Sequence, residues 1–342
     1  MRAAVFQGVG RPLSIEQVSD PRHKADEVVI EVAFAGICGS DLHIAELGAA
    51  PAGTIFGHEF AGTIVECGHD VRGWAPGDRV TALPIHVCAQ CDACDEGLPG
   101  LCRSAIFSGT SPLVQGAYAQ YVVARAGMLQ RLPAGVDFSE GAMVEPLAVA
   151  YHAVALAELK PDEDVLVIGA GPIGAAVALF ARLAGARKVV VSESFADRRA
   201  RALEVGATAT IDPATEPVAA AFAALSGRPP PVIFECVGKP GLLQQCIDLA
   251  GIRGRIIVAG ACFQDDTIKP ITGLAKEVSL RFSQCYTERD FEAVIDMISK
   301  GRAYAKPLHT RTISFDELPS AFDELRKPSS DCKVLIDPGA SH

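Results

Sequence analysis

The pattern of apolar and polar positions changes near residue 152 of the 342-residue chain. Before that point, short runs rich in β-branched residues are bounded by Gly, Pro or Asp, as at 27–33 and 63–67. Such runs are typical of β-strands, and long helical periodicity is absent from this part of the chain. We therefore expect residues 1–152 to form an antiparallel, barrel-like β domain.

After residue 152, compact apolar strands alternate with helical segments. Residues 164–168 are predicted to form a strand, and an alanine-rich apolar helix is expected at 175–184. Further strands follow in the same alternation, at 188–192, 209–211, 232–235 and 255–259. Alternation of this kind predicts a doubly wound parallel sheet with helices on both faces, here over residues 153–285.

The last part of the chain, residues 286–342, leaves this alternation. It begins with a helical segment at 288–300 and ends in short strands such as 333–336. We expect it to return to the first domain.

Composition and charge exclude some classes of partner. Apolar residues make up 49% of the chain, the net charge is −10 and the isoelectric point is near 5.3. No run of Lys or Arg stands out, so neither nucleic acid nor an anionic membrane is expected as a partner. No uninterrupted apolar stretch approaches 18 residues, and the N-terminal residues lack the features of a signal peptide. Eleven cysteines without an export signal favour a reducing compartment, and we expect the cytoplasm.

Four of the cysteines fall within fifteen residues. They are Cys88, Cys91, Cys94 and Cys102, with the spacing C-x2-C-x2-C-x7-C. Short gaps allow the sulfurs to converge, and four thiolates form a closed tetrahedral zinc site that does no chemistry. An iron–sulfur cluster and disulfides are the alternatives, although the cluster pattern continues with x3-C-Pro and this chain does not. We predict a structural zinc lobe inserted in the first domain, at about residues 86–103.

A glycine-rich turn follows the strand at 164–168. Its sequence is Gly169-Ala170-Gly171-Pro172-Ile173-Gly174, a G-x-G-x-x-G pattern that opens a helix. In this context Gly169 permits a tight turn, Gly171 lets backbone amides approach a pyrophosphate, and Gly174 allows close packing of helix and sheet. We predict a dinucleotide site; the alternative is a glycine-rich turn that binds no nucleotide.

Glu193 lies nineteen positions after Gly174, at the end of the next strand. A carboxylate there accepts hydrogen bonds from the adenosine ribose and repels a 2′-phosphate, so NAD is expected rather than NADP. Arg198 and Arg199 are a reason for caution, because a guanidinium nearby could hold that phosphate.

Three separate stretches carry further metal-type ligands. Cys38 lies in a Gly-rich turn, His58-Glu59 follows Gly57, and Glu145 precedes the second domain. Taken singly, each has an ordinary structural explanation as a buried thiol or a hydrogen-bonded polar group. Their combination is what indicates a metal site.

The combination resembles the zinc-dependent medium-chain dehydrogenases, particularly the sorbitol, threonine and butanediol dehydrogenase branch. The resemblance rests on Gly57-His58-Glu59-x2-Gly62-x5-Gly68, on the four-cysteine lobe and on the glycine-rich turn, in that order. It implies a GroES-like β-barrel catalytic domain beside the Rossmann domain, NAD as cofactor, and two zinc ions per chain. It also implies a small alcohol as substrate and a homodimer or homotetramer.

The resemblance implies which residues hold the catalytic zinc. Cys38 and His58 are ligands, and Glu59 or Glu145 completes the set together with water. Glu145 stands where alcohol dehydrogenases have a second cysteine, and which glutamate binds directly is left open. Replacing a thiolate with a carboxylate makes the site harder and more weakly binding. Asp41 is implied to orient the histidine from outside the coordination sphere.

The resemblance also implies a mechanism. Zinc lowers the pKa of the substrate hydroxyl, Ser40 takes its proton, and His43 passes the proton towards solvent through the cofactor ribose. The carbon then delivers hydride to the nicotinamide, whose carboxamide is expected to meet the backbone of Val258 and Ala259. The structural alternatives are a turn-forming serine at Ser40 and a surface histidine at His43.

The substrate is the least defined part of the resemblance. Polyol dehydrogenases of this branch carry an Arg-Tyr pair near residues 283–286, where this chain lacks the arginine. The loop between His43 and Gly57 is also short and apolar. We expect a secondary alcohol or diol, with sugar alcohols and L-threonine as alternatives. A zinc-independent quinone-type reductase or a non-catalytic NAD-binding protein is disfavoured by the complete ligand set.

Overall fold

The computed structural model describes residues 1–340 and divides into two compact units. The first unit contains Met1–Glu145, Thr287–Arg302 and the C-terminal segment from His309, and the second contains Pro146–Tyr286 and Ala303–Leu308. None of the helices within the described residues has the length and apolar character that crossing a bilayer requires.

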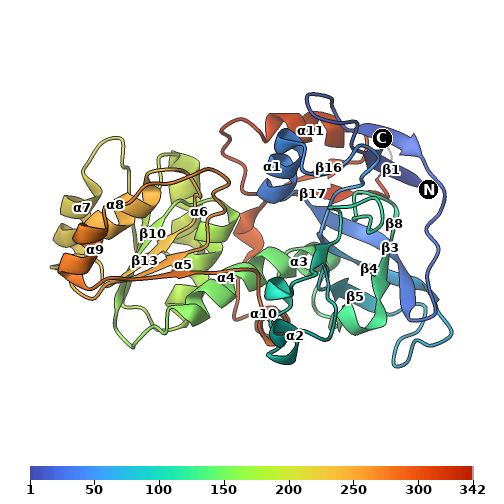
Figure 1. Cartoon of the computed structure of the whole chain (residues 1–342), viewed down its shortest axis with the longest axis horizontal. Helices are drawn as coiled ribbons and strands as arrows, with labels where there is room; N and C mark the ends of the chain where they lie inside the picture. Colours follow the sequence, from blue (N-terminus) through green and yellow to red (C-terminus); the bar gives the residue numbers. More distant parts are fainter. Residues whose placement is uncertain (341–342) are drawn as a thin grey trace. The chain divides into compact units, whose positions relative to one another are not determined.

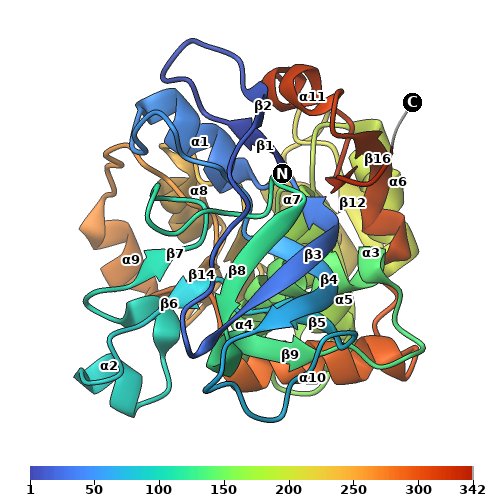
Figure 2. The same ribbon diagram turned by 90° about the vertical axis from the view of Figure 1, so that its right-hand side faces the viewer.

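The first unit is built on a seven-stranded sheet with the order β16-β17-β3-β4-β5-β9, in which β8 also pairs with β3. Figure 2 shows β3, β4, β5, β8 and β9 of this sheet side by side. Its strands are β3 (Glu27–Gly36), β4 (Glu59–Cys67), β5 (Arg79–Ala82), β8 (Tyr121–Arg125), β9 (Leu129–Arg131), β16 (His309–Ser314) and β17 (Lys333–Asp337). All pairs are antiparallel except β16 with β17. The predicted barrel-like β domain is confirmed, with one parallel pair that the sequence pattern did not indicate.

Smaller elements complete the first unit. They are β1 (Arg2–Val5), β2 (Ser14–Gln17), β6 (Ile85–His86), β7 (Ile106–Phe107), α1 (Gly39–Leu47), α2 (Asp92–Asp95), α3 (Phe138–Ala142), α10 (Glu288–Ser299), α11 (Leu318–Glu324), η1 (Pro99–Leu101) and η2 (Ala126–Met128). The elements α2, η1, β6 and β7 belong to the four-cysteine lobe. Helix α10 begins where predicted because Thr287 and Asp290 form a capping box that satisfies its first amides.

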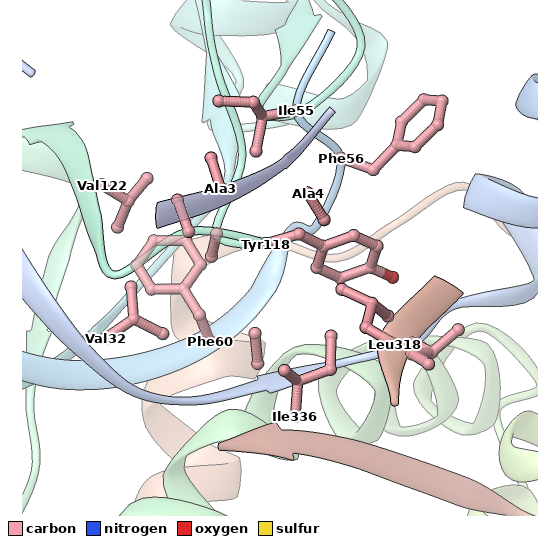
Figure 3. Close-up of a cluster of buried hydrophobic side chains, with 14 of the residues drawn as sticks. Ala3, Ala4, Val32, Ile55, Phe56, Phe60, Tyr118, Val122, Leu318 and Ile336 are labelled. Carbon is pink, nitrogen blue, oxygen red and sulfur yellow. The ribbon is translucent and has the colours of Figure 1, made fainter. Parts of the chain in front are cut away.

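The core of the first unit gathers residues from distant parts of the chain. Figure 3 shows Tyr118 among Ala4 from β1, Phe60 from β4, Leu318 from α11 and Ile336 from β17. All five are buried. Burial of this apolar surface fixes the C-terminal segment against the central strands.

The second unit contains a six-stranded parallel sheet with the order β12-β11-β10-β13-β14-β15. Its strands are β10 (Asp164–Ile168), β11 (Lys188–Ser192), β12 (Ala209–Ile211), β13 (Val232–Glu235), β14 (Arg255–Val258) and β15 (Ser279–Phe282). The chain order 3-2-1-4-5-6 is that of a Rossmann sheet, so the predicted doubly wound fold is confirmed. The central strands are buried along their whole length, which is why they appear in the sequence as continuous apolar runs.

Helices cover both faces of this sheet. They are α5 (Pro172–Leu183), α6 (Ala196–Val205), α7 (Val218–Ser226), α8 (Leu242–Leu249) and α9 (Pro270–Lys276), with the short η3 (Lys306–Leu308). Figure 1 shows α5 and α6 on one side of the strands and α8 and α9 on the other. Helix α4 (Val144–Leu156), which the sequence pattern did not indicate, precedes them and spans the chain boundary between the two units.

Candidate active site

The pairing of β3 with β4 brings the first metal-type residues together. Gly36, the last residue of β3, pairs with Glu59, the first residue of β4. Cys38, two residues after the end of β3, therefore lies close to His58, the residue directly before β4. The ligand atoms of Cys38, His58 and Glu59 lie within 4.8 Å of one another, and His58 and Glu59 are buried. One thiolate, one imidazole and one carboxylate are a donor set that fits Zn²⁺.

Asp41 and Tyr118 fix the histidine of this cluster. Asp41 Oδ1 lies 3.3 Å from His58 Nδ1, which leaves Nε2 as the metal-binding nitrogen. The hydroxyl of Tyr118 donates a 2.7 Å hydrogen bond to Asp41 Oδ2, and both residues are fully buried. Burial alone would lower the pKa of His58, but the charges of Asp41 and Cys38 outweigh it and raise that pKa.

Sequence reasoning missed Tyr118, although one glycine of the motif depends on it. Gly57 has a φ of 100°, and a Cβ there would lie 2.4 Å from the Tyr118 ring. The glycine before His58 is thus required both by its backbone conformation and by the ring beside it. No local pattern around Tyr118 signals this role.

A second missed residue is Lys333, the first residue of β17. Its Nζ donates to both carboxylate oxygens of Glu59, at 2.6 and 2.7 Å, and to the Ile37 carbonyl at 3.1 Å. Burial would lower the pKa of Lys333, but the negative charges of Glu59 and Cys38 raise it. A lysine within an apolar strand pattern was the available signal in the sequence.

The remaining residues predicted for this site lie around the cluster. Ser40 donates a hydrogen bond to Cys38 Sγ at 3.2 Å. His43 lies three residues further along α1, is exposed, and has Nδ1 4.0 Å from Glu46 Oε2. Glu145 is buried in the first turn of α4, outside the group whose ligand atoms converge, but its charge contributes to the raised pKa of Lys333.

The four-cysteine lobe has the geometry of a closed site. The Sγ atoms of Cys91 and Cys94 are 3.5 Å apart, those of Cys88 and Cys102 3.6 Å, and those of Cys88 and Cys94 3.9 Å. Tetrahedral zinc with bonds of about 2.3 Å places its sulfurs about 3.8 Å apart. Sulfurs this close leave room for one ion rather than an iron–sulfur cluster, and all four are free of disulfides.

Two of the four thiols of the lobe, Cys91 and Cys102, are biased towards the thiolate form. A backbone hydrogen bond at Gln90 would lower the pKa of Cys88, but hydrogen bonds to the neighbouring cysteines and burial raise it to about 11. Hydrogen bonds from the backbone amides of Arg103 and Cys94 lower the pKa of Cys91 to about 6. Backbone hydrogen bonds at Cys88 and Ser104 also lower the pKa of Cys102. Amides pointing at sulfur stabilise the ligands of a metal that requires deprotonated thiols.

The glycine-rich turn of the second unit has the shape that a dinucleotide requires. Gly169 has a φ of 92°, and a Cβ at Gly174 would lie 2.0 Å from the Gly169 carbonyl oxygen. Gly171 precedes α5, whose first residues are Pro172 and Ile173, and a Cβ there would meet nothing within 4 Å. The open space at a helix N-terminus fits the close approach of a phosphate group.

Glu193 lies directly beside this turn. Its Oε2 accepts the Ala170 amide at 2.9 Å, and its Oε1 accepts the Phe195 amide at 3.0 Å. A carboxylate offers about four acceptor positions, so capacity for ribose hydroxyls remains. Arg199 is committed elsewhere, because its guanidinium donates to the Glu193 carbonyl and pairs with Asp212 at 3.1 Å.

Three further features lie at the carboxyl ends of strands β11, β13 and β14 or directly after them. Arg198 stacks over the Phe195 ring, with 5.3 Å between guanidinium carbon and ring centroid. Val258 ends β14, and Ala259 donates its amide to the Glu235 carbonyl at 2.8 Å. Glu235, which sequence reasoning missed, also accepts the amides of the two residues after Cys236 and so orders the loop after β13.

Known proteins match the chain over nearly its whole length. The alcohol dehydrogenase GroES-like domain family matches residues 24–134, and the zinc-binding dehydrogenase family matches residues 172–300. A 2-dehydro-3-deoxy-L-galactonate 5-dehydrogenase of Pseudoalteromonas atlantica is 33% identical over 92% of both chains.

Solved structures agree with this assignment. A zinc-binding dehydrogenase of Sinorhizobium meliloti bound to NADP superposes with a TM-score of 0.92 at 32% identity, covering 98% of this chain and 99% of that one. The 2R,3R-butanediol dehydrogenase of Bacillus subtilis superposes with a TM-score of 0.90 at 31% identity, covering 99% of each chain. By its sequence, its fold and the donor chemistry of its sites, the chain belongs to the zinc-dependent medium-chain dehydrogenase family, in the sorbitol and butanediol dehydrogenase branch.

Proposed function

We propose that the protein oxidises a secondary alcohol or diol to the ketone, reversibly, with NAD as hydride acceptor. The convergence of Cys38, His58 and a buried carboxylate on one point, in a chain that also carries a nucleotide turn, is the observation that supports this most. The reaction requires the alcohol carbon and the nicotinamide to be held in contact while water is excluded.

Cys38, His58 and one glutamate, Glu59 or Glu145, hold the catalytic zinc. When bound, the metal supplies Lewis acidity that makes the substrate hydroxyl easier to deprotonate. Asp41 keeps the imidazole of His58 in the orientation that presents Nε2. The four cysteines of the lobe hold the second, structural zinc, and we expect two zinc ions per chain.

Ser40 and His43 carry the proton away from the substrate. The Ser40 hydroxyl lies against Cys38 Sγ and so stands next to the reacting oxygen. His43 follows at a spacing of three on the same helix, which places the two side chains on one face. The Ser40 oxygen takes the hydroxyl proton as its own hydrogen turns from Cys38 Sγ and passes towards His43, whose exposed ring returns a proton to solvent.

The second unit binds the dinucleotide. Gly169, Gly171 and Gly174 shape the phosphate site, together with Pro172 and Ile173 at the start of the helix. NAD accepts the hydride, and the backbone of Val258 and Ala259 contacts its carboxamide.

We infer NAD rather than NADP from the groups beside the ribose. Glu193 opposes a 2′-phosphate, and Arg199 is occupied by Asp212 and by backbone carbonyls. The structure of the Sinorhizobium meliloti relative contains NADP. Arg198 is therefore the side chain to test for binding of a 2′-phosphate.

Two substrate classes are supported by different observations. The missing arginine near residues 283–286 and the apolar loop after His43 favour a diol or simple secondary alcohol, as in the butanediol dehydrogenase. The 33% identical relative acts, by its name, on a sugar acid, which supports a polyhydroxylated substrate as the second candidate. L-Threonine stays an alternative from the family resemblance, without an observation of its own.

We further propose a homodimer or homotetramer that works in the cytoplasm. Strand β15 is the edge of the parallel sheet, Phe282 on it is 64% exposed, and Ile271 and Leu274 of α9 are also exposed. An exposed edge with apolar neighbours fits pairing with a second copy. All eleven cysteines are free thiols, as expected in a reducing compartment. Residues 1–152 with 286–342 form the catalytic domain of this proposal, and 153–285 bind NAD.

A substrate panel with zinc analysis tests the proposal. Purified protein is assayed for NAD and NADP reduction with 2,3-butanediol, cyclohexanol, a terpene alcohol, sorbitol, xylitol, a sugar acid and threonine. Turnover of the diol or simple alcohols with NAD, at two zinc ions per chain, is the expected result. Turnover only with sorbitol, xylitol or the sugar acid would support the second candidate, and none with any alcohol at full zinc content would refute the oxidation itself.

A further inference from the structure

Glu235 ends strand β13 at the centre of the parallel sheet. It is paired with Ile168 of β10 on one side and with Val258 of β14 on the other, and Figure 1 labels β10 and β13 within this sheet. Ligands of doubly wound sheets bind beyond the carboxyl ends of the strands at the point where the strand order reverses, which here lies between β10 and β13. Ile168 directly precedes the glycine-rich turn, and Val258 begins the segment proposed to meet the nicotinamide carboxamide. Glu235 therefore lies between the two parts of the proposed nucleotide site.

The side chain and the backbone of Glu235 each hold one loop. Its Oε1 accepts the amides of Val237 and Gly238, at 2.7 and 2.9 Å. Its carbonyl oxygen accepts the amides of Ala259 and Gly260, at 2.8 and 2.9 Å. Hydrogen bonds from amides to a carboxylate are stronger than those to a neutral acceptor. Four backbone N–H groups from the loops after β13 and β14 are thus fixed by a single residue.

The two loops pack backbone against backbone around this side chain. A Cβ on Gly260 would lie 2.3 Å from the Gly238 nitrogen and 2.6 Å from Glu235 Oε2. A Cβ on Gly238 would lie 2.6 Å from the carbonyl carbon of Ala261. Because no side chain separates the loops, a displacement of the loop after β13 is passed directly to the loop after β14.

The loop after β13 also contacts the glycine-rich turn. The Cys236 amide donates to the Ile168 carbonyl at 3.0 Å. A Cβ on Gly169 would lie 2.5 Å from Val237 Cγ2, and one on Gly174 would lie 3.3 Å from Cys236 Cβ. The glycine-rich turn and the two loops therefore form one continuous set of contacts, with the carboxylate at its centre.

Core packing does not explain a carboxylate at this position. Glu235 follows the apolar run Val232-Ile233-Phe234 and is 2% exposed. Within the described residues, no lysine, arginine or histidine forms an ion pair with it, and backbone amides are its hydrogen-bond partners. Burial of a carboxylate costs free energy that these hydrogen bonds must offset. What the carboxylate provides in return is the order of the loop that follows it.

We propose that Glu235 is a positioning residue for hydride transfer. Its hydrogen bonds hold the loops after β13 and β14 in one arrangement before the nucleotide binds, so that the backbone of residues 258–260 meets the nicotinamide at a fixed place. The inference rests on the proposed oxidation with NAD, and it names the side chain that prepares the nicotinamide end of the site. Loss of Glu235 should therefore affect the nicotinamide half of the cofactor and leave binding of the adenosine and pyrophosphate half largely unchanged.

NADH and ADP-ribose distinguish the two halves, because ADP-ribose lacks the nicotinamide. Glu235→Ala is expected to weaken NADH binding by about tenfold and ADP-ribose binding by about threefold or less. It should lower kcat by about 100-fold, because a small displacement of the nicotinamide slows hydride transfer. The deuterium isotope effect on kcat should rise, measured with the alcohol that the substrate panel identifies, deuterated at the carbinol carbon. Glu235→Gln keeps an acceptor oxygen for the two amides and should stay within about threefold of the wild type in every readout.

Glu163→Ala is the matched control. Glu163 directly precedes β10, at the amino ends of the strands, and its carboxylate accepts the Lys160 amide at 2.9 Å. Its loss should change neither nucleotide affinity. A role of Glu235 in stability alone would weaken NADH and ADP-ribose binding equally in Glu235→Ala. That result, or a Glu235→Gln variant as impaired as Glu235→Ala, would overturn the inference.

Hydrogen exchange of the wild-type protein tests the inference even if Glu235→Ala does not fold. The amides of residues 237, 238, 259 and 260 should exchange at least about 100-fold more slowly than in an unfolded chain, already without nucleotide, and NADH should slow them little further. Fast exchange that NADH alone suppresses would overturn the inference, because the ligand and not Glu235 would then order the loops.

Failure of the inference differs from failure of the proposed function. A wild-type protein that binds NADH but oxidises no alcohol at full zinc content would remove the function, while the comparison of NADH with ADP-ribose would still decide the role of Glu235. Turnover with NAD together with equal losses of NADH and ADP-ribose binding in Glu235→Ala would remove only that role.

Discussion

The two metal-type sites of this chain are assembled in opposite ways. The lobe takes all four ligands from one stretch, Cys88 to Cys102, in short elements with little core of their own. The mixed-donor site, formed by Cys38, His58 and Glu59, takes its residues from the turn after β3 and from the start of β4. Its ion pair with Lys333 of β17 joins positions 274 apart in sequence. The carboxylate of this site is buried, whereas three of the lobe's four cysteines are only half-buried.

The difference lies in what holds each site in place. Sheet pairing, the Tyr118–Asp41 hydrogen bond and the Glu59–Lys333 pair fix the mixed-donor site through protein contacts alone. The lobe has few such contacts, so its metal must supply much of its order. Loss of the metal should therefore abolish activity at the mixed-donor site without unfolding it. Loss of zinc from the four-cysteine lobe should unfold the lobe.

The largest effect is expected at the mixed-donor site. Cys38→Ala or His58→Ala removes a ligand and should lower kcat/KM by about 1,000-fold or more, because the Lewis acid is lost. Binding of NADH, followed by the change in nucleotide fluorescence, should persist because the nucleotide-binding residues lie in the other unit. Cys67→Ala, a half-buried thiol at the end of β4, is the matched control. Turnover retained in either ligand variant would contradict the assignment.

The second effect concerns stability of the lobe. Cys94→Ser opens the four-sulfur site and should lower the melting temperature by about 5 °C or more, through loss of a structural zinc. Limited proteolysis should then cut within 88–102, while the mixed-donor site keeps its zinc. Cys262→Ser, at an exposed thiol, should change nothing. A protease-resistant lobe after zinc loss would show that protein contacts, not metal, order it.

The nucleotide turn, like the lobe, is encoded locally and gives a third, smaller effect. Glu193→Ala should reduce the NAD-to-NADP ratio of kcat/KM by about tenfold, because the carboxylate that opposes a 2′-phosphate is gone. The exposed Glu204 of α6 provides the control as Glu204→Ala. An unchanged ratio would mean that another group determines the preference between NAD and NADP, and Arg198→Ala would be tested next.

The smallest effect tests the scaffolding around the histidine. Tyr118→Phe removes the hydrogen bond to Asp41 and should weaken catalytic zinc binding by about tenfold, with a stability loss of about 1–2 kcal/mol. Zinc affinity is measured by chelator competition and stability by denaturant unfolding. Tyr304→Phe changes an exposed hydroxyl and serves as control. Equal zinc affinity in both variants would show that Tyr118 packs in the core and does not affect zinc binding.

Much of the fold could be predicted because its signals are local. The strands at 164–168 and 188–192 occur where expected, since buried parallel strands have a continuous apolar run at their centre. The cysteine spacing likewise predicted sulfurs that converge. Helix α4 was missed because its sequence is almost uniformly apolar, so it lacks the alternation of apolar and polar positions that identifies an amphipathic helix.

The rest of the candidate site depends on contacts that no local pattern encodes. Tyr118 and Lys333 are identified as partners of Asp41 and Glu59 only once β17 and the chain before β8 are packed against β3 and β4. The partner of Glu59 was hidden in the sequence for the same reason, because the lysine that pairs with it lies in the last strand.

Zinc content measured against turnover during a chelator titration tests the central claim most directly. Purified enzyme is predicted to hold two zinc ions per chain and to lose one first, in proportion to activity and with the fold intact. Loss of the second should coincide with proteolytic opening of residues 88–102. Full turnover after the first zinc has left, or activity that follows only the zinc of the four-cysteine lobe, would contradict the account.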